Sequence, residues 1–173
     1  ESGETILYPT DTGWGIGCDA LSDNATKKIF KLKKRDYSNG LICLASSFEM
    51  ISKYADISKI EKLNQISYDS PTTFIFDNPK DISDFVLGNN RSIAFRVPKN
   101  SFCIRLIETF GKPIVSTSAN LSGFKVPLNF NDIEPEIKES VAYVVKLEQA
   151  KECNASSRIL KYNYDNECFD RLR

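Results

Sequence analysis

Short apolar segments, rich in β-branched and aromatic residues, recur along the whole chain and most constrain its fold. Their length and composition predict β-strands. Amphipathic helix patterns separate some of these segments, whereas others follow one another directly. This mixed order predicts a single α/β domain with a mixed sheet. The predicted strands are residues 5–8, 41–45, 72–76, 92–97, 113–115, 141–147, 159–162 and 168–172.

A first helix is predicted after Ser22 or Asp23, since either side chain can cap its N-terminus. Ala25, Ile29 and Leu32 follow at helical spacing and form one apolar stripe. The polar residues of the same segment are mostly lysines, which we expect on the opposite face. Further helices are predicted over residues 48–54, 57–66, 102–110 and 133–139.

The length of 173 residues suits one domain with a single core. No apolar run approaches the roughly 18 residues of a membrane span, and no signal peptide is visible. The five cysteines are widely spaced, which is typical of reduced thiols in a cytosolic protein. We therefore expect a cytoplasmic protein without a membrane partner.

The chain contains no histidine. This excludes a Ser-His-Asp triad, a Cys-His pair and any histidine-ligated metal site. The cysteines form no C-x-x-C pair, so a zinc knuckle is not expected, and no protein metal site is predicted. Because there are 23 basic and 23 acidic residues, the net charge argues neither for nor against a polyanionic partner.

Residues 10–17 are predicted to form a loop in which Gly13, Gly15 and Gly17 alternate with other residues. Such glycines let a backbone approach a ligand closely, or they serve a purely structural turn. Neither G-x-G-x-x-G nor G-x-x-x-x-G-K-[ST] occurs, so any ATP site here is not a Walker site.

A basic run extends from Lys27 to Arg35 and holds six cations in nine residues. The ordinary interpretation is a solvated helix face. Lys33 and Arg35 lie next to a predicted loop, where they can clamp a phosphate or a carboxylate. Contact with an RNA backbone is the other functional interpretation.

The segment of residues 113–123 carries many hydrogen-bonding side chains directly after a predicted strand. Such a segment can form an anion-binding nest with its backbone N–H groups, or an elaborate turn bonded to its own backbone. The side chains concerned are Ser116, Thr117, Ser118, Asn120 and Ser122.

Arg96 lies inside the predicted strand of residues 92–97. Alternation places it on one face of the sheet together with Ser92 and Ala94. An arginine at this position is either an ordinary exposed residue or an anchor for a ligand, and exposure is the commoner case.

These pieces occur in the same order in the YrdC-type L-threonylcarbamoyl-AMP synthases, a family that the chain resembles over nearly its whole length. Each motif alone is weak, but the ordered combination is specific. The resemblance implies one YrdC-like domain over residues 1–173, without the N-terminal helix usual in the family. The matching segments are YPTDTGWGIG at 8–17, KKR at 33–35, IAFRVP at 93–98, PIVSTSANLSG at 113–123 and ASS at 155–157.

The resemblance implies an open, twisted mixed sheet with a large concave cavity. It also implies a nucleotidyltransferase that converts L-threonine, bicarbonate and ATP, with Mg²⁺ on the phosphates, to L-threonylcarbamoyl-AMP and pyrophosphate. That product serves the threonylcarbamoyl modification of tRNA, so protein partners of this pathway are implied as well. No residue has the pattern of a strong general base, and we expect catalysis by positioning and electrostatic stabilisation.

Site residues carried over from the family fall into two groups. The ATP group comprises Lys33, Arg35, Ser118 and Asn120 for the phosphates, with Asn39, Ser92 and Arg173 as further contacts. The threonine group comprises Thr12, Arg96, Ser116 and Ser156.

The chain departs from the family pattern at several positions. Leu44 replaces a frequent histidine, Trp14 replaces a usual tyrosine, and Arg158 interrupts a usually apolar strand. The Pro-Gly-Pro-x-Thr motif is reduced to DSPTT at residues 69–73. Two alternatives stay open: a non-catalytic module that binds tRNA or double-stranded RNA through the basic helix, and a nucleotide-binding paralogue without synthase activity.

Overall fold

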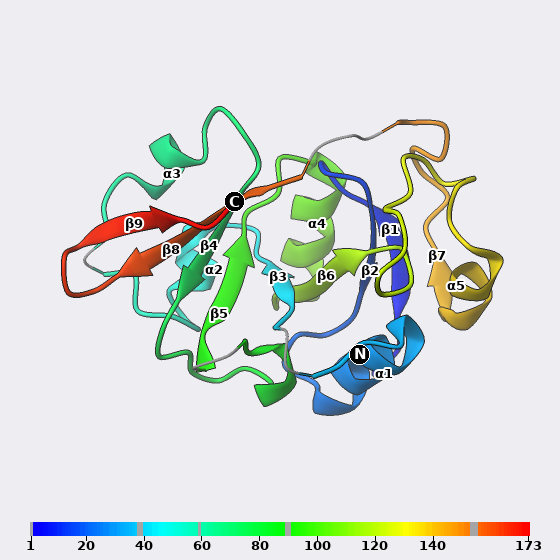
Figure 1. Cartoon of the computed structure of the whole chain (residues 1–173), viewed down its shortest axis with the longest axis horizontal. Helices are drawn as coiled ribbons and strands as arrows, with labels where there is room; N and C mark the ends of the chain where they lie inside the picture. Colours follow the sequence, from blue (N-terminus) through cyan, green and yellow to red (C-terminus); the bar gives the residue numbers. More distant parts are fainter. Residues whose placement is uncertain (1, 38–39, 59, 89–90, 153–155) are drawn as a thin grey trace.

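The computed structural model describes residues 2–37, 40–58, 60–88, 91–152 and 156–173. The strands of this part of the chain form one mixed sheet in the order β7-β1-β2-β6-β3-β5-β4-β8-β9 (Figure 1). The predicted α/β domain with a mixed sheet is therefore confirmed. The strands are β1 Ile6–Pro9, β2 Trp14–Gly17, β3 Ile42–Leu44, β4 Thr72–Phe76, β5 Ile93–Arg96, β6 Ile114–Ser118, β7 Tyr143–Val144, β8 Arg158–Asn163 and β9 Cys168–Arg171.

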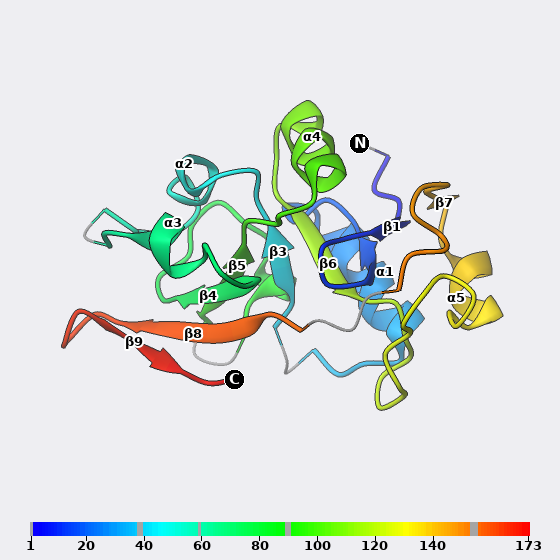
Figure 2. The same cartoon turned by 90° about the horizontal axis from the view of Figure 1, so that it is seen from above.

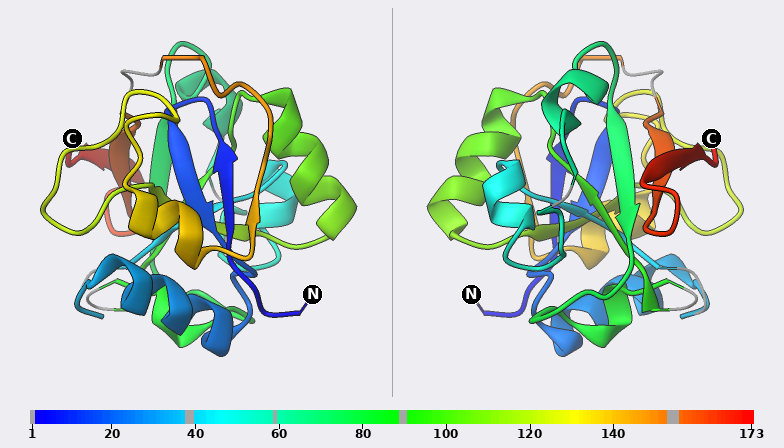
Figure 3. Two further views of the ribbon diagram at one scale, coloured as in Figure 1. Left: turned by 90° about the vertical axis from the view of Figure 1, so that its right-hand side faces the viewer. Right: turned by 90° about the vertical axis from the view of Figure 1, so that its left-hand side faces the viewer.

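Short helices connect the strands of the sheet. Figure 2 shows α2 and α4 on one side, and the β8–β9 hairpin with the loop of residues 121–130 on the other. Figure 3 shows α1 and η1 together at one end of the sheet, where Ser83 Oγ donates to Asp23 Oδ1 at 2.6 Å. The helices are α1 Asp23–Lys33, α2 Phe48–Ile51, α3 Leu63–Ile66, α4 Ser101–Phe110, α5 Pro135–Ser140 and the 3-10 turn η1 Asp84–Val86.

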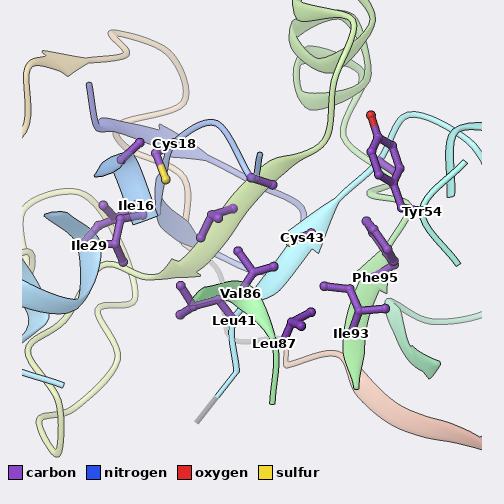
Figure 4. Packing of buried hydrophobic residues seen from close by; sticks show 14 of the residues in the cluster. Ile16, Cys18, Ile29, Leu41, Cys43, Tyr54, Val86, Leu87, Ile93 and Phe95 are labelled. Atoms are coloured by element: carbon purple, nitrogen blue, oxygen red, sulfur yellow. The ribbon is translucent and has the colours of Figure 1, made fainter. Parts of the chain in front are cut away.

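The main hydrophobic core joins α1 to the sheet. Ile29 of α1 belongs to one cluster with Ile16 of β2, Leu41 and Val86 (Figure 4). A second cluster lies under α4 and includes Leu44 of β3. Both clusters are fully buried at their centres, and together they hold the sheet between α1 and α4.

The glycine-rich segment is a strand, so the predicted loop is wrong for residues 14–17. Its residues are all buried and pair with β1 on one side and β6 on the other. A Cβ atom on Gly17 would lie 2.5 Å from the Val115 carbonyl oxygen and 2.6 Å from the Tyr8 ring. The glycines are thus explained by close approach of neighbouring strands, which local sequence does not report.

Other elements match the prediction to different degrees. Strand β4 and helices α1 and α4 are confirmed, with Ser22 as the N-cap of α1 and Gly111 as the C-cap of α4. The strand predicted over residues 141–147 shrinks to β7, because only two residues reach β1 in register. β6 is longer than predicted, since Ser118 still pairs with Gly15 of β2. In the described part of the chain, no helix is long and apolar enough to cross a membrane.

Candidate functional site

A cavity of about 460 Å³ opens at the sheet, and β2, β3, β4, β5 and β6 all contribute residues to its lining. Its floor is apolar and comes from three adjacent strands, because Ala94 of β5 lies in register with Ile42 of β3 and Ile75 of β4. Residue alternation therefore exposes the same face of each strand to the cavity. The predicted concave cavity is present.

The polar lining of the cavity carries positive charge and hydroxyl groups. Three arginines, Arg35, Arg96 and Arg173, line it together with nine serines and threonines. No carboxylate side chain lines it within the described residues. The lining therefore carries positive charge, although the whole chain has no formal net charge. Such a lining favours anionic ligands, carboxylates and phosphates above all.

Arg96 is the most deeply held of these arginines. Its side chain is only 5% exposed, so of the two interpretations of Arg96 the ordinary exposed residue is excluded. Nη1 donates to Thr12 Oγ1 at 2.8 Å and lies 3.2 Å from Asp11 Oδ1. Asp11 Oδ1 has no hydrogen-bond partner, so this contact is a charge pairing without hydrogen-bond geometry. Nε of Arg96 is buried and has no hydrogen-bond partner in the described structure, whereas the residue as a whole lines the cavity.

Arg35 reaches the cavity from the end of α1. The chain leaves the helix at Lys34, which adopts a left-handed conformation with φ 51°. This turn directs Arg35 into the cavity lining, where Nη2 donates to the Gly40 carbonyl at 3.1 Å. Partial burial lowers the pKa of Arg35 from its ordinary value, but a guanidinium stays protonated in proteins.

Lys33 is two residues away and does not line the cavity. Its Nζ is buried behind the wall and donates to the carbonyls of Ser118 at 2.5 Å and Asn120 at 2.7 Å. Burial, with a smaller contribution from Arg35, lowers the pKa of Lys33 to about 8. The side chain of Asn120 is also turned away from the cavity and lines a second groove, where Nδ2 donates to the Phe124 carbonyl at 2.6 Å.

The late serine pair forms the opposite wall. Ser157 Oγ and Thr73 Oγ1 share a hydrogen bond of 2.8 Å, and Arg173 donates twice to the Ser157 carbonyl. Ser157, Thr73 and Thr10 line the cavity but are absent from the predicted site. Ser157 adjoins the predicted Ser156, so that motif was the available signal. Thr73 ends the reduced Pro-Gly-Pro-x-Thr motif at residues 69–73, which was the available signal for it.

The structure brings most of the predicted site residues together. Asn39 lies outside the described residues, and Lys33 and Asn120 lie behind the wall. No group of three or more acidic, cysteine or histidine side chains in the described chain is arranged to hold a metal ion. The predicted residues that line the cavity are Thr12, Arg35, Ser92, Arg96, Ser116, Ser118, Ser156 and Arg173.

The basic face of α1 is exposed, but most of its lysines have partners. Lys28 pairs with Glu4 at 2.9 Å and Lys34 pairs with Glu136 at 3.0 Å. Lys27 Nζ lies 4.3 Å from the centre of the Phe85 ring. The two ion pairs offset part of the positive potential that an RNA backbone would require, whereas the Phe85 contact leaves the charge of Lys27 in place.

The departures from the family motif have structural roles. Leu44 is fully buried under α4, and Trp14 packs on Phe130 with ring centres 4.9 Å apart. Arg158 Nε donates to Thr72 Oγ1 at 2.8 Å, and its Nη2 donates to the Ile66 carbonyl. Arg158 therefore ties the end of α3 to the start of β4.

Fold and site together define an α/β protein with a cationic, hydroxyl-rich cavity on an open mixed sheet, a class suited to anionic substrates. Comparison with known proteins makes this more specific. The Sua5/YciO/YrdC family model, described as telomere recombination, matches residues 1–172, and the chain belongs to this family.

Curated relatives in this family are named threonylcarbamoyl-AMP synthase. The protein from Photobacterium profundum is 33% identical over 150 residues, which cover 84% of this chain and 81% of the relative. The protein from Enterobacter sp. is 40% identical over 124 residues, which cover 69% of this chain and 65% of the relative.

Solved structures share the fold. P. abyssi Sua5 complexed with L-threonine matches with a TM-score of 0.82 and 26% identity, over 92% of this chain and 47% of that one. The chain thus spans about half the length of that Sua5 protein. E. coli YciO matches with a TM-score of 0.79 and 22% identity over 98% of this chain and 82% of that one, a likeness that shows the fold alone.

Proposed function

We propose that this protein synthesises L-threonylcarbamoyl-AMP from L-threonine, bicarbonate and ATP, with release of pyrophosphate. The observation that carries the proposal is the cavity itself, in which three arginines and nine hydroxyl side chains occur without a described carboxylate. All three substrates are anionic or carry an anionic group, so one cationic cavity suits them together. The names of the relatives and the Sua5 complex with L-threonine support the same reaction.

Arg96 is the residue that we assign to the threonine carboxylate. Arg96 lines the cavity, and its planar guanidinium suits a carboxylate. Thr12 is already bonded to Arg96 Nη1, which keeps the guanidinium fixed before substrate arrives. Ser116 and Ser156 also line the cavity and complete the proposed threonine contacts.

Arg35 and Ser118 are the residues that we assign to the nucleotide phosphates, with Ser92 and Arg173 as further ATP contacts. Mg²⁺ belongs to this proposal as a companion of ATP. The described lining offers it hydroxyl groups but no carboxylate, so phosphate oxygens and water would supply most of its ligands. Bound there, the ion would neutralise phosphate charge.

The proposed chemistry has two steps. The threonine amine attacks the bicarbonate carbon to give a carbamate with loss of water, and a carbamate oxygen then attacks the α-phosphorus of ATP and displaces pyrophosphate. No described side chain of the cavity is a histidine or a carboxylate that would act as a strong base. The protein's contribution is therefore to hold the reacting groups together and to stabilise phosphate charge.

The test is pyrophosphate release by the purified protein with ATP, bicarbonate and either L-threonine or L-serine. We expect release that requires an amino acid and is faster with L-threonine. Release that ignores the amino acid would identify a nucleotide-hydrolysing paralogue, and no release from folded protein would contradict the proposal. Transfer of the product to tRNA, with the pathway partners that this requires, belongs to the same proposal. RNA binding alone is less favoured, because Lys28 and Lys34 of the basic run are ion-paired with acidic residues.

A further inference from the structure

Lys33 is a buried cation to which the proposed reaction assigns no role. It is the last residue of α1 and is 3% exposed. Besides the two carbonyls, its Nζ lies 3.4 Å from Asn120 Oδ1, so three acceptors surround the three ammonium protons. The backbone adds a return contact, since Ser122 N donates to the Lys33 carbonyl at 3.0 Å. These bonds join the end of α1 to the chain beyond β6.

Ser118 links this arrangement to the cavity. Its hydroxyl lines the cavity, yet its proton is donated to Asn120 Oδ1 at 2.5 Å. In this state the Ser118 oxygen can only accept a hydrogen bond from a ligand. A phosphate oxygen is an acceptor, so Ser118 must turn its proton away from Asn120 to bind one. Asn120 Oδ1 would then be left with Lys33 as its nearby donor.

We propose that Lys33 is a positioning residue, which holds residues 118–120 from behind the wall and replaces Ser118 as the donor to Asn120 when phosphate binds. The phosphate part of this inference rests on the proposed function, whereas the holding part does not. Lys33 then stays behind the wall and contacts no substrate. Arg35, two residues further on, supplies the charge on the cavity side.

The burial of Lys33 fits this role. An ammonium removed from water is costly, and the pKa of Lys33 is lowered accordingly. A carbonyl-bonded cation is a stronger donor than a neutral amine, because charge-assisted hydrogen bonds are stronger than neutral ones. The charged form therefore gives the firmer hold on residues 118–120.

The first experiment measures amide hydrogen exchange without ligand in Lys33→Met, Lys33→Arg and the control Lys31→Met, whose side chain is exposed on the same helix. The reporters are the amides of Asn120 and Ser122, which donate to Ser118 and Lys33 carbonyls. We expect exchange about tenfold faster in Lys33→Met, less change in Lys33→Arg, and no change in the control. Unchanged exchange in folded Lys33→Met would overturn the inference.

The second experiment is a double-mutant cycle on ATP affinity, measured by calorimetry so that no catalytic activity is needed. Lys33→Met alone should weaken ATP binding about tenfold. In the background of Ser118→Ala it should change affinity less than twofold, because Lys33 acts through Ser118. Additive losses would identify Lys33 as a direct phosphate ligand and overturn the inference.

Two controls keep the outcomes distinct. If the wild-type protein fails to bind ATP, the proposed function fails, while the exchange experiment still decides whether Lys33 holds the segment. If Lys33→Met does not fold, the wild-type protein is measured over a pH series in its place, because Lys33 loses its charge near pH 8. Amide exchange at Asn120 and Ser122, corrected for the intrinsic rate, should then rise above pH 8 relative to exchange at Leu7. Parallel behaviour of Ser122 and Leu7 would count against the inference.

Discussion

The two ends of the cavity hold their arginines by different means. Arg96 lies on β5 in the middle of the sheet, is almost fully buried and faces the charge of Asp11. Arg35 follows the end of α1, where a left-handed turn directs it, and it rests on a loop carbonyl. The end of the cavity at Arg96, called the strand end below, is thus fixed by the sheet and by a buried charge pair. The end of the cavity at Arg35, called the helix end below, is fixed by a turn and by the contacts of Lys33.

This difference determines what a substitution would disturb. A change at Arg96 removes a possible ligand contact and also leaves Asp11 buried without its charge partner, so function and stability fall together. A change at Arg35 removes a partly exposed side chain that donates to a backbone carbonyl. Activity and stability should therefore separate at the helix end and stay linked at the strand end.

The largest effect is expected for Arg96→Ala. We expect kcat/KM for threonine to fall by about 100-fold or more, since loss of one partner of a buried charge pair costs about 2–5 kcal/mol. The thermal midpoint should also fall. Arg96→Lys should not restore activity, because an ammonium cannot reproduce the planar donor pair. Full activity of Arg96→Ala in the pyrophosphate assay would remove Arg96 from the threonine site.

A smaller effect is expected for Arg35→Met. ATP affinity should weaken about 30-fold, as expected for loss of a hydrogen bond from a charged donor, while the threonine KM changes little. The matched control is Arg105→Met, because Arg105 is exposed on α4 and does not line the cavity. Calorimetry and thermal unfolding of both variants provide the check. A loss of stability equal to that of Arg96→Ala would contradict the proposed contrast between the ends.

The pH dependence should be a few-fold and confined to the nucleotide end. The pKa of Lys33 is about 8, so ATP affinity should decline as pH rises from 7 to 9, while the threonine end is unaffected. The free energy of unfolding should change in the opposite direction. The pKa of Lys33 is lowered from 10.5 in the folded protein, so between pH 8 and 10.5 the unfolded chain binds more protons, and the contribution of Lys33 to stability rises with pH. Burial raises the pKa of Cys18 and Cys103 to about 12, outside this window.

The smallest effect is expected on the outer face of α1. Lys27→Met combined with Lys34→Met should change the free energy of unfolding by less than about 0.5 kcal/mol, as is typical for exposed pairs. Pyrophosphate release should stay within twofold of wild type. Gel-shift binding of tRNA over a salt series gives the second measurement. A steep salt slope that these substitutions flatten would favour the RNA-binding alternative.

The sequence by itself determined which residue types the cavity contains. Period-two alternation on β5 correctly placed Arg96 beside Ser92 and Ala94, because side-chain direction in a strand is fixed locally. The caps of α1 and α4 are equally local, since they depend on one side chain or one glycine. The ordered motifs indicated the family before any contact was known.

Only the tertiary structure decided how these residues are used. Lys33 and Arg35 belong to one motif, yet one lies behind the wall and the other lines the cavity, because Lys34 turns the chain between them. The strand conformation of Gly15 and Gly17, the burial of Arg96 and the presence of Thr73 all depend on neighbours far away in sequence. Pairing across the sheet creates these neighbours, and local sequence does not encode their distances.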